Sequence, residues 1–172
     1  AKASSEVSEE YNGKPQTAAR LIEGPNSGGW WWSSVKGSDP TPWIQVELAS
    51  LSIINSLTVR WKMSEGHPGP RPMQYQVKSS TDGQIWADTG VSHANVADLT
   101  PNTMTDTLPG WSAPTRFIRI EMSDSSYKPV HWFPNWKQLS SSLPKETLEV
   151  SDKANTCFSC CYLLAYGTPL GS

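Results

Sequence analysis

The sequence predicts an all-β protein built as an antiparallel β-sandwich, and three observations support this prediction. Aromatic and β-branched residues alternate with polar residues in short runs, and turn residues bound each run. The segment Thr81-Asp82-Gly83-Gln84, which lies between two such runs, is a strong hairpin signal. No amphipathic helix longer than two turns separates the runs, which favours a sandwich over a mixed α/β fold.

The expected elements follow in order along the chain. Residues 1–29 are polar and rich in Gly and Pro, so we expect ordered loop there, with one short helical turn at Thr17–Ile22. The strand-like runs are Trp43–Leu48, Ser56–Lys62, Met73–Ser79, Ile85–Thr89 and Phe117–Met122. In the second run, Leu57, Val59 and Trp61 share one face of the predicted strand, which we expect to face the core.

The pattern loosens after residue 122. A segment broken by prolines extends to residue 143, and Glu146–Val150 is the only later segment that we expect to form a closing strand. Residues 151–172 contain all three cysteines and are predicted to be an irregular tail with free or locally paired thiols. A structural zinc site there would need four ligands, and no second Cys pair or His lies near in the sequence.

Composition limits the classes of function. A chain of 172 residues suffices for one domain with its own core, and we expect most of the nine tryptophans to lie in that core. The formal charge is −2 and Lys and Arg are spread along the chain, which argues against a nucleic-acid partner. The sequence contains no apolar stretch of about 18 residues, so it predicts no membrane-spanning helix. Residues 1–10 also lack the apolar middle of a signal peptide.

The sequence contains no recognisable catalytic pattern, so we expect no enzyme activity. There is no Gly-x-Ser-x-Gly motif, and His67, His93 and His131 lie far apart in the sequence. The acidic residues are scattered, and no pair is singled out as the two carboxylates of a glycosidase.

Four motifs occur in an order that is typical of one family. They are Trp32-Ser33, Trp43-Ile44-Gln45-Val46-Glu47-Leu48, Ser80-Thr81-Asp82-Gly83-Gln84-Ile85-Trp86 and Arg116-Phe117-Ile118-Arg119-Ile120. In these motifs the sequence closely resembles the coagulation factor 5/8 type C domain, also called the discoidin or galactose-binding-like domain. The resemblance implies a jelly-roll sandwich at residues 1–150, followed by the Cys-containing tail at residues 151–172. We expect Trp43 and Trp86 to be buried structural anchors.

The resemblance also implies a calcium site. In this family the loop before the tryptophan motif binds calcium through an acidic side chain, a hydroxyl and backbone carbonyls, and a glutamate near the C-terminal strand completes the shell. The corresponding residues here are Glu23, Asn26 and Ser27, with Glu149 as the closing carboxylate. A solvated Glu23 beside a Gly-Pro turn is the alternative interpretation.

A ligand surface is expected at the loop end of the sandwich. In carbohydrate-binding relatives the loop that corresponds to residues 63–72 contacts sugar hydroxyls, often through Glu, His and Arg. Glu65, His67 and Arg71 supply these residue types here, although they are also compatible with ordinary exposed loop side chains. Trp30 and Trp132 are candidate aromatic platforms for a sugar ring, as is Trp136.

These features predict a non-catalytic binding and adhesion module that recognises glycans or glycoproteins on cell-surface or extracellular material. Two alternatives stay open. One is a phospholipid-surface binder, which ranks lower because only Arg20 and Lys36 lie near the triple tryptophan. The other is an intracellular protein-interaction domain, which a core without cysteines and the absence of an Asn-x-Ser/Thr site would both suit. The resemblance favours an extracellular or cell-surface location, without excluding an intracellular one.

Overall fold

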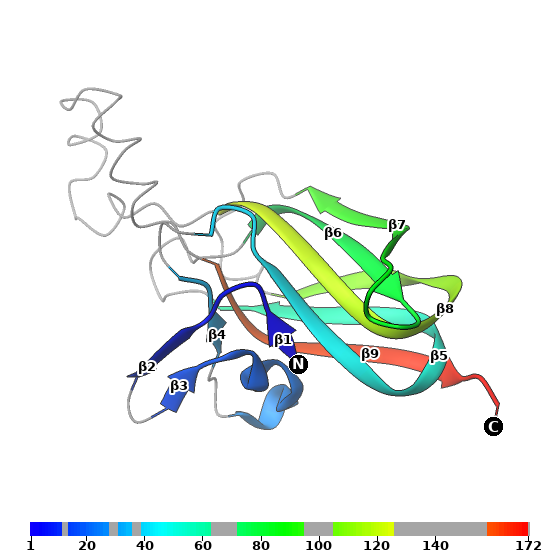
Figure 1. The fold of residues 1–172 in the computed structure, drawn as a ribbon, viewed down its shortest axis with the longest axis horizontal. Coiled ribbons are helices and arrows are strands. Elements are labelled where there is room, and N and C mark those ends of the chain that lie inside the picture. The colour runs from blue at the N-terminus through cyan, green and yellow to red at the C-terminus, as the bar shows by residue number, and fades with distance from the viewer. Residues whose placement is uncertain are drawn as a thin grey trace.

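The computed structural model describes residues 1–11, 14–27, 31–35, 39–62, 72–94, 105–125 and 158–171. Within them, one antiparallel sheet runs in the order β4-β9-β5-β8-β6-β7, β1 pairs with β5, and β2 and β3 form a separate ribbon (Figure 1). The strands are β1 (Lys2–Ala3), β2 (Val7–Tyr11), β3 (Lys14–Gln16), β4 (Trp32–Ser33), β5 (Trp43–Trp61), β6 (Pro72–Ser80), β7 (Ala87–Ala94), β8 (Thr105–Ser125) and β9 (Ser159–Pro169). The 3-10 helices are η1 (Ala18–Ile22) and η2 (Gly24–Ser27).

The sheet folds into two layers because its two longest strands run through both. The first half of β5 pairs with the second half of β8, and the remaining halves pair with each other. Register shifts between Glu47 and Ser52 mark the bend in β5, as expected of bulges, which bend a strand. We call the layer of β1, the first half of β5, the second half of β8, β6 and β7 the front layer. The back layer consists of the other halves of β5 and β8 with β9 and β4.

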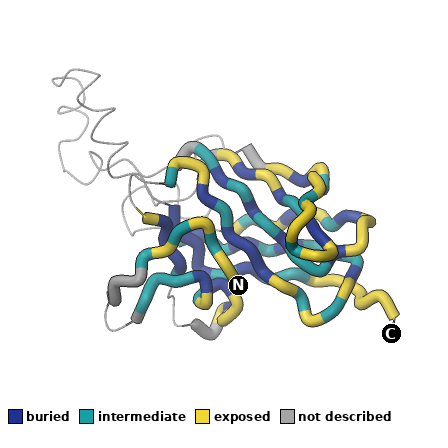
Figure 2. The backbone as a smooth tube through the Cα atoms, in the orientation of Figure 1, coloured by how far each residue is buried: buried dark blue, intermediate teal, exposed yellow. Residues whose placement is uncertain are grey.

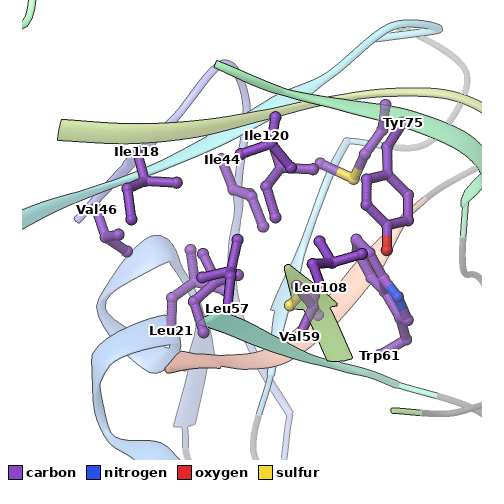
Figure 3. Close-up of a cluster of buried hydrophobic side chains, with 14 of the residues drawn as sticks. Leu21, Ile44, Val46, Leu57, Val59, Trp61, Tyr75, Leu108, Ile118 and Ile120 are labelled. Carbon is purple, nitrogen blue, oxygen red and sulfur yellow. The ribbon is translucent and has the colours of Figure 1, made fainter. Parts of the chain in front are cut away.

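The hydrophobic core fills the space between these layers. Ile44 and Ile120 come from the front layer, Leu57 and Val59 from the back layer, and Leu21 from η1 (Figure 3). All five side chains are fully buried. Buried and exposed positions alternate along much of the strands, as Figure 2 shows, because successive strand residues point to opposite faces. The predicted antiparallel β-sandwich is therefore confirmed.

Most expected elements are present, with shifted boundaries. The runs at residues 43–48 and 56–62 are two halves of the single strand β5, and the expected strand at Ile85–Thr89 begins only at Ala87. The helical turn predicted at Thr17–Ile22 is η1, and the predicted core face of Leu57, Val59 and Trp61 is fully buried. No helix in the described part of the chain has the length and apolar character needed to cross a lipid bilayer.

The irregular tail predicted for residues 151–172 is wrong for Ser159–Pro169, which forms β9 between β4 and β5. This segment is apolar on both faces over residues 160–166, so no polar alternation marks it as a strand. Val59 pairs in register with Leu163, which packs into the core. The closing strand expected at Glu146–Val150 lies outside the described residues.

Two of the three predicted free or paired thiols lie in β9. Cys160 and Cys161 are both free and both buried. Burial raises the pKa of each thiol above its ordinary value, because removal from water disfavours the thiolate. These two cysteines are therefore protonated parts of the packed sheet at neutral pH. Cys157 lies outside the described residues.

Three of the family-like motifs meet on the outer face of the front layer. The Arg119 guanidinium lies between the rings of Trp43 and Trp86, 4.0 Å from each ring centroid. Arg119 Nη2 also donates a hydrogen bond of 3.0 Å to Gln45 Oε1. Trp43 and Trp86 are half-buried, so the prediction that both are buried anchors is wrong. They hold a cation on the surface instead of filling the core.

The hairpin between β6 and β7 carries Trp86 to this stack. Asp82 Oδ1 accepts hydrogen bonds from the backbone N–H groups of Gln84 and Ile85 and from the Ser80 hydroxyl. These bonds lower the pKa of Asp82, because they favour its charged form. Gly83 has a φ of 76°, which a glycine adopts without strain, so the predicted turn is confirmed.

Close packing around the bend of β5 requires glycine on both neighbouring strands. A Cβ atom on Gly110 of β8 would overlap the Ile54 carbonyl oxygen, and one on Gly167 of β9 would overlap the Ile53 carbonyl oxygen. Both contacts are with backbone atoms, which cannot swing aside like a flexible side chain. The bend is therefore enclosed by β8 and β9.

We predict that Gly110→Ala destabilises the fold by about 1–3 kcal/mol, because the added methyl group forces the backbone of β5 or β8 to move. The matched control is Gly171→Ala, since a Cβ there meets nothing within 4 Å and should change stability by less than about 0.5 kcal/mol. Urea denaturation measures both variants. Equal stabilities would show that β8 does not approach β5 this closely.

We also predict that Trp86→Ala costs about 1–2 kcal/mol, which is less than a fully buried tryptophan would cost, because Trp86 is half-buried and contributes mainly one ring to the stack. Trp86→Phe should retain part of this stability. The neighbouring control Ile85→Ala should be neutral, since Ile85 is 78% exposed. Urea denaturation of the three variants measures these changes in the free energy of unfolding. If Trp86→Ala leaves this free energy unchanged, the stack of Trp86 on Arg119 does not stabilise the fold.

Candidate functional site

A groove of about 500 Å³ opens at the end of the front layer where β6 begins and β8 ends. Its described lining residues are Thr41, Trp43, Gln74, Tyr75, Gln76, Ser92, Glu121, Met122 and Ser123. Tyr75 and Met122 are buried core residues, whereas their strand neighbours Gln74 and Gln76 are exposed. Strand alternation therefore directs the polar side chains out of the core and into the groove.

Four lining residues form one row across four strands. Trp43 on β5 pairs in register with Glu121 on β8. Glu121 pairs with Gln76 on β6, and Gln76 pairs with Ser92 on β7. Neighbouring strands lie about 4.8 Å apart, so the row spans about 14 Å. The sheet thus holds an indole, a carboxylate, an amide and a hydroxyl in a fixed order.

This set of groups suits a ligand that carries several hydroxyls and an apolar face. The amides of Gln74 and Gln76 can both donate and accept hydrogen bonds, and the Thr41 and Ser123 hydroxyls can do the same. Trp43 supplies a flat apolar surface next to them. A few convergent polar groups around an apolar surface are typical of small-molecule sites.

A shared carboxylate ties the two layers together beneath this groove. Asp106 Oδ2 on β8 accepts hydrogen bonds of 2.8 Å from both Trp61 Nε1 and the Tyr75 hydroxyl. The Trp61 and Tyr75 ring centroids are 5.3 Å apart, and Figure 3 shows the Tyr75 hydroxyl directed toward Trp61. Because Tyr75 lies between Gln74 and Gln76, these contacts fix the part of β6 that lines the groove.

Two basic residues, Lys78 on β6 and Arg119 on β8, lie one row of the sheet away from the row that lines the groove. Lys78 Nζ is 3.9 Å from Glu121 Oε2, and Lys78 pairs in register with Arg119. Burial lowers the pKa of Arg119, and the nearby Glu121 charge opposes this shift. Neither Lys78 nor Arg119 lines the groove.

The predicted ligand-binding residues Glu65, His67, Arg71, Trp30 and Trp132 all lie outside the described residues. The first three belong to the segment that joins Trp61 at the end of β5 to Pro72 at the start of β6. The groove begins two residues further along β6, at Gln74. Pro72, which follows this segment in the chain, therefore lies near the groove. Whether these side chains bind a ligand stays a prediction.

The predicted calcium site lies only partly within the described residues, which do not test it. Glu23 follows η1, and its Oε1 lies 2.6 Å from Arg20 Nη1, so its carboxylate is already paired with a cation. Asn26 and Ser27 belong to η2, but their side chains are not described, and Glu149 is outside the described residues. The described part of the chain contains no group of three His, Cys, Asp or Glu side chains suited to a metal. Calcium binding stays a prediction.

Sequence reasoning missed Gln74, Gln76 and Glu121. Each is the polar residue between two apolar neighbours in an expected strand, so alternation alone places each of them on the outer face. What the sequence does not reveal is the register that brings β8 between β5 and β6 and so joins these residues to Trp43.

Comparison with known structures finds the same fold in carbohydrate-binding modules. Module CBM32-3 from a family 31 glycoside hydrolase of Clostridium perfringens has a TM-score of 0.65 and 13% identity, with 98% of this chain and 89% of that chain covered. Chitosan-binding module 2 of a chitosanase/glucanase from Paenibacillus sp. IK-5, solved with chitotriose, has a TM-score of 0.62 and 15% identity, with 96% and 93% covered. The Clostridium perfringens module CpGH89CBM32-5, solved with GalNAc-β-1,3-galactose, has a TM-score of 0.62 and 16% identity, with 96% and 92% covered.

Sequence comparison identifies the family. No curated protein matches the chain at a significant level. The family model of the F5/8 type C domain matches residues 1–140. The solved structures cover nearly the whole chain, β9 included. At 13% and 15% identity, this similarity establishes a shared fold and not a shared ligand. The chain belongs to the F5/8 type C domain family.

Proposed function

We propose that this domain is a non-catalytic carbohydrate-binding module that holds a glycan in the groove at the end of the front layer. The observation that carries the proposal is the row of Trp43, Glu121, Gln76 and Ser92 across four strands. A sugar ring presents hydroxyls around its edge and C–H groups on its faces. The row offers hydrogen-bonding groups for the former and an indole for the latter.

The setting of the row also favours binding. Its members lie on paired strands, so their backbones are already ordered before a ligand arrives, which lowers the entropy cost of association. The Arg119 stack restrains Trp43 in the same way. Gln74 and Gln76 are exposed and therefore accessible to a ligand.

The structural neighbours support the choice of ligand class, since two of them were solved with bound oligosaccharides. We place Glu65, His67 and Arg71 in the same site, because their segment leads directly into the groove strand β6. Trp30 and Trp132 are further candidates for contact with sugar rings. Glycans and glycoproteins on cell-surface or extracellular material are the proposed partners.

We predict that Gln76→Ala weakens binding of a glycan selected on an array by about tenfold, because bound sugar hydroxyls lose a hydrogen-bond partner. Stability should change by less than about 0.5 kcal/mol, since the side chain is exposed. Gln84→Ala is the matched control, as Gln84 is also exposed but lies at the hairpin tip. Isothermal titration calorimetry measures binding. Unchanged affinity in Gln76→Ala would exclude the groove.

Arg71→Ala in the same titration tests the loop and should also weaken binding, because a guanidinium donates paired hydrogen bonds to neighbouring hydroxyls. An effect of Arg71→Ala without an effect of Gln76→Ala would move the site to the loop. Binding to anionic phospholipid vesicles, with no binding on the glycan array, would favour the membrane alternative and contradict the proposal.

Calcium binding is a further part of the proposal. Glu23, which lies between η1 and η2, is the proposed acidic ligand. Because a calcium ion must displace Arg20 from this carboxylate, we expect weak binding. Calcium at millimolar concentration should raise the melting temperature of the native chain but not of Glu23→Gln, since a ligand that binds only the folded state stabilises it. An equal shift in both proteins, measured by scanning calorimetry, would remove Glu23 from the site.

A further inference from the structure

Glu121 is the one charged side chain among the described residues that line the groove. It lies at the centre of the polar row, between Trp43 and Gln76. Its side chain is 40% exposed, and its ion-pair partner Lys78 is 3.9 Å away, at the outer limit of such a contact. A carboxylate accepts several hydrogen bonds and donates none. Glu121 therefore has accepting capacity to offer a ligand.

Two cations lie near this carboxylate, but neither belongs to the residues that line the groove. Lys78 and Arg119 occupy the adjacent row of the sheet, where they pair in register with each other. Arg119 is enclosed between two indole rings and is hydrogen-bonded to Gln45. These cations weaken the field of Glu121 at long range. Selection by charge in the groove must therefore act through direct contact with the Glu121 oxygens.

Trp43 lies directly opposite Glu121 in the register. The Arg119 guanidinium over its ring shows that this indole accepts a cation. An indole and a carboxylate side by side both favour a positively charged ligand group, the first through its ring electrons and the second through its charge. A ligand carboxylate at the same place would be repelled by the like charge of Glu121.

We propose that the groove selects glycans with free amino groups, such as oligomers of glucosamine, and rejects glycans that carry carboxylates. This inference rests on the proposed carbohydrate-binding function. A protonated amine can pair with Glu121 as an ion pair in which the donor and the acceptor are both charged, whereas a hydroxyl or an amide offers this carboxylate only a neutral donor. N-acetylation removes that charge, so Glu121 is the specificity-determining residue.

The experiment compares three trisaccharides by isothermal titration calorimetry at about pH 6, where a primary amine is protonated. They are chitotriose, its fully N-acetylated form and trigalacturonic acid. The native chain should bind chitotriose about tenfold more tightly than the acetylated trimer, because only the free amines are charged, and should bind the acidic trimer weakest. Glu121→Gln should abolish the preference for chitotriose, so that the affinities for chitotriose and for its acetylated form lie within about twofold of each other.

Glu47→Gln is the matched control. Glu47 lies on β5, on the same outer face of the front layer as Glu121, but outside the groove. Its Oε1 atom forms an ion pair of 2.9 Å with Arg116 Nη2, and its replacement should leave the preference for chitotriose unchanged. If the native chain binds the acetylated trimer at least as tightly as chitotriose, the selection of amino groups is wrong while the proposed glycan binding stands. A preference that persists in Glu121→Gln also overturns the inference. If the native chain binds none of these trimers and no glycan on an array, both the proposed function and the inference fail.

Discussion

The pairing of β5 with β8 on both sides of their bend is the constraint on which the rest of the structure depends. Because both strands bend at the same place, one hydrogen-bonded sheet becomes two layers that face each other. Gly110 and Gly167 allow β8 and β9 to approach the bend closely. The same pairing places β8 between β5 and β6 in the front layer, and so aligns Trp43, Glu121 and Gln76. Fold and groove thus share one cause.

The Arg119 stack links the family motifs to the groove. One ring of the stack, Trp43, is also a wall of the groove, and the other, Trp86, is delivered by a turn that Asp82 stabilises. Burial lowers the pKa of Arg119, and the nearby charge of Glu121 opposes this shift. The motifs therefore orient a surface aromatic residue as well as stabilise the sheet, which explains why Trp43 and Trp86 are half-buried.

Sequence reasoning succeeded where the signal is local. Alternation predicted the faces of Leu57, Val59 and Trp61, and the Asp82-Gly83 tip predicted the hairpin, because both depend on near neighbours in the chain. It failed for β9, whose apolar residues on both faces hide its period, and for Trp43 and Trp86, whose environment depends on Arg119 from a distant strand. The groove likewise depends on register between strands, which short-range patterns do not specify.

Chemical-shift mapping by nuclear magnetic resonance shows whether a glycan binds along the row that crosses the front layer. On titration with the best ligand from a glycan array, we expect the largest shift changes at the Trp43 indole N–H and the side-chain amides of Gln74 and Gln76. The Gln84 side-chain amide should not change, since it lies at the far hairpin tip. Shift changes that leave Trp43, Gln74 and Gln76 unaffected would contradict binding in the groove.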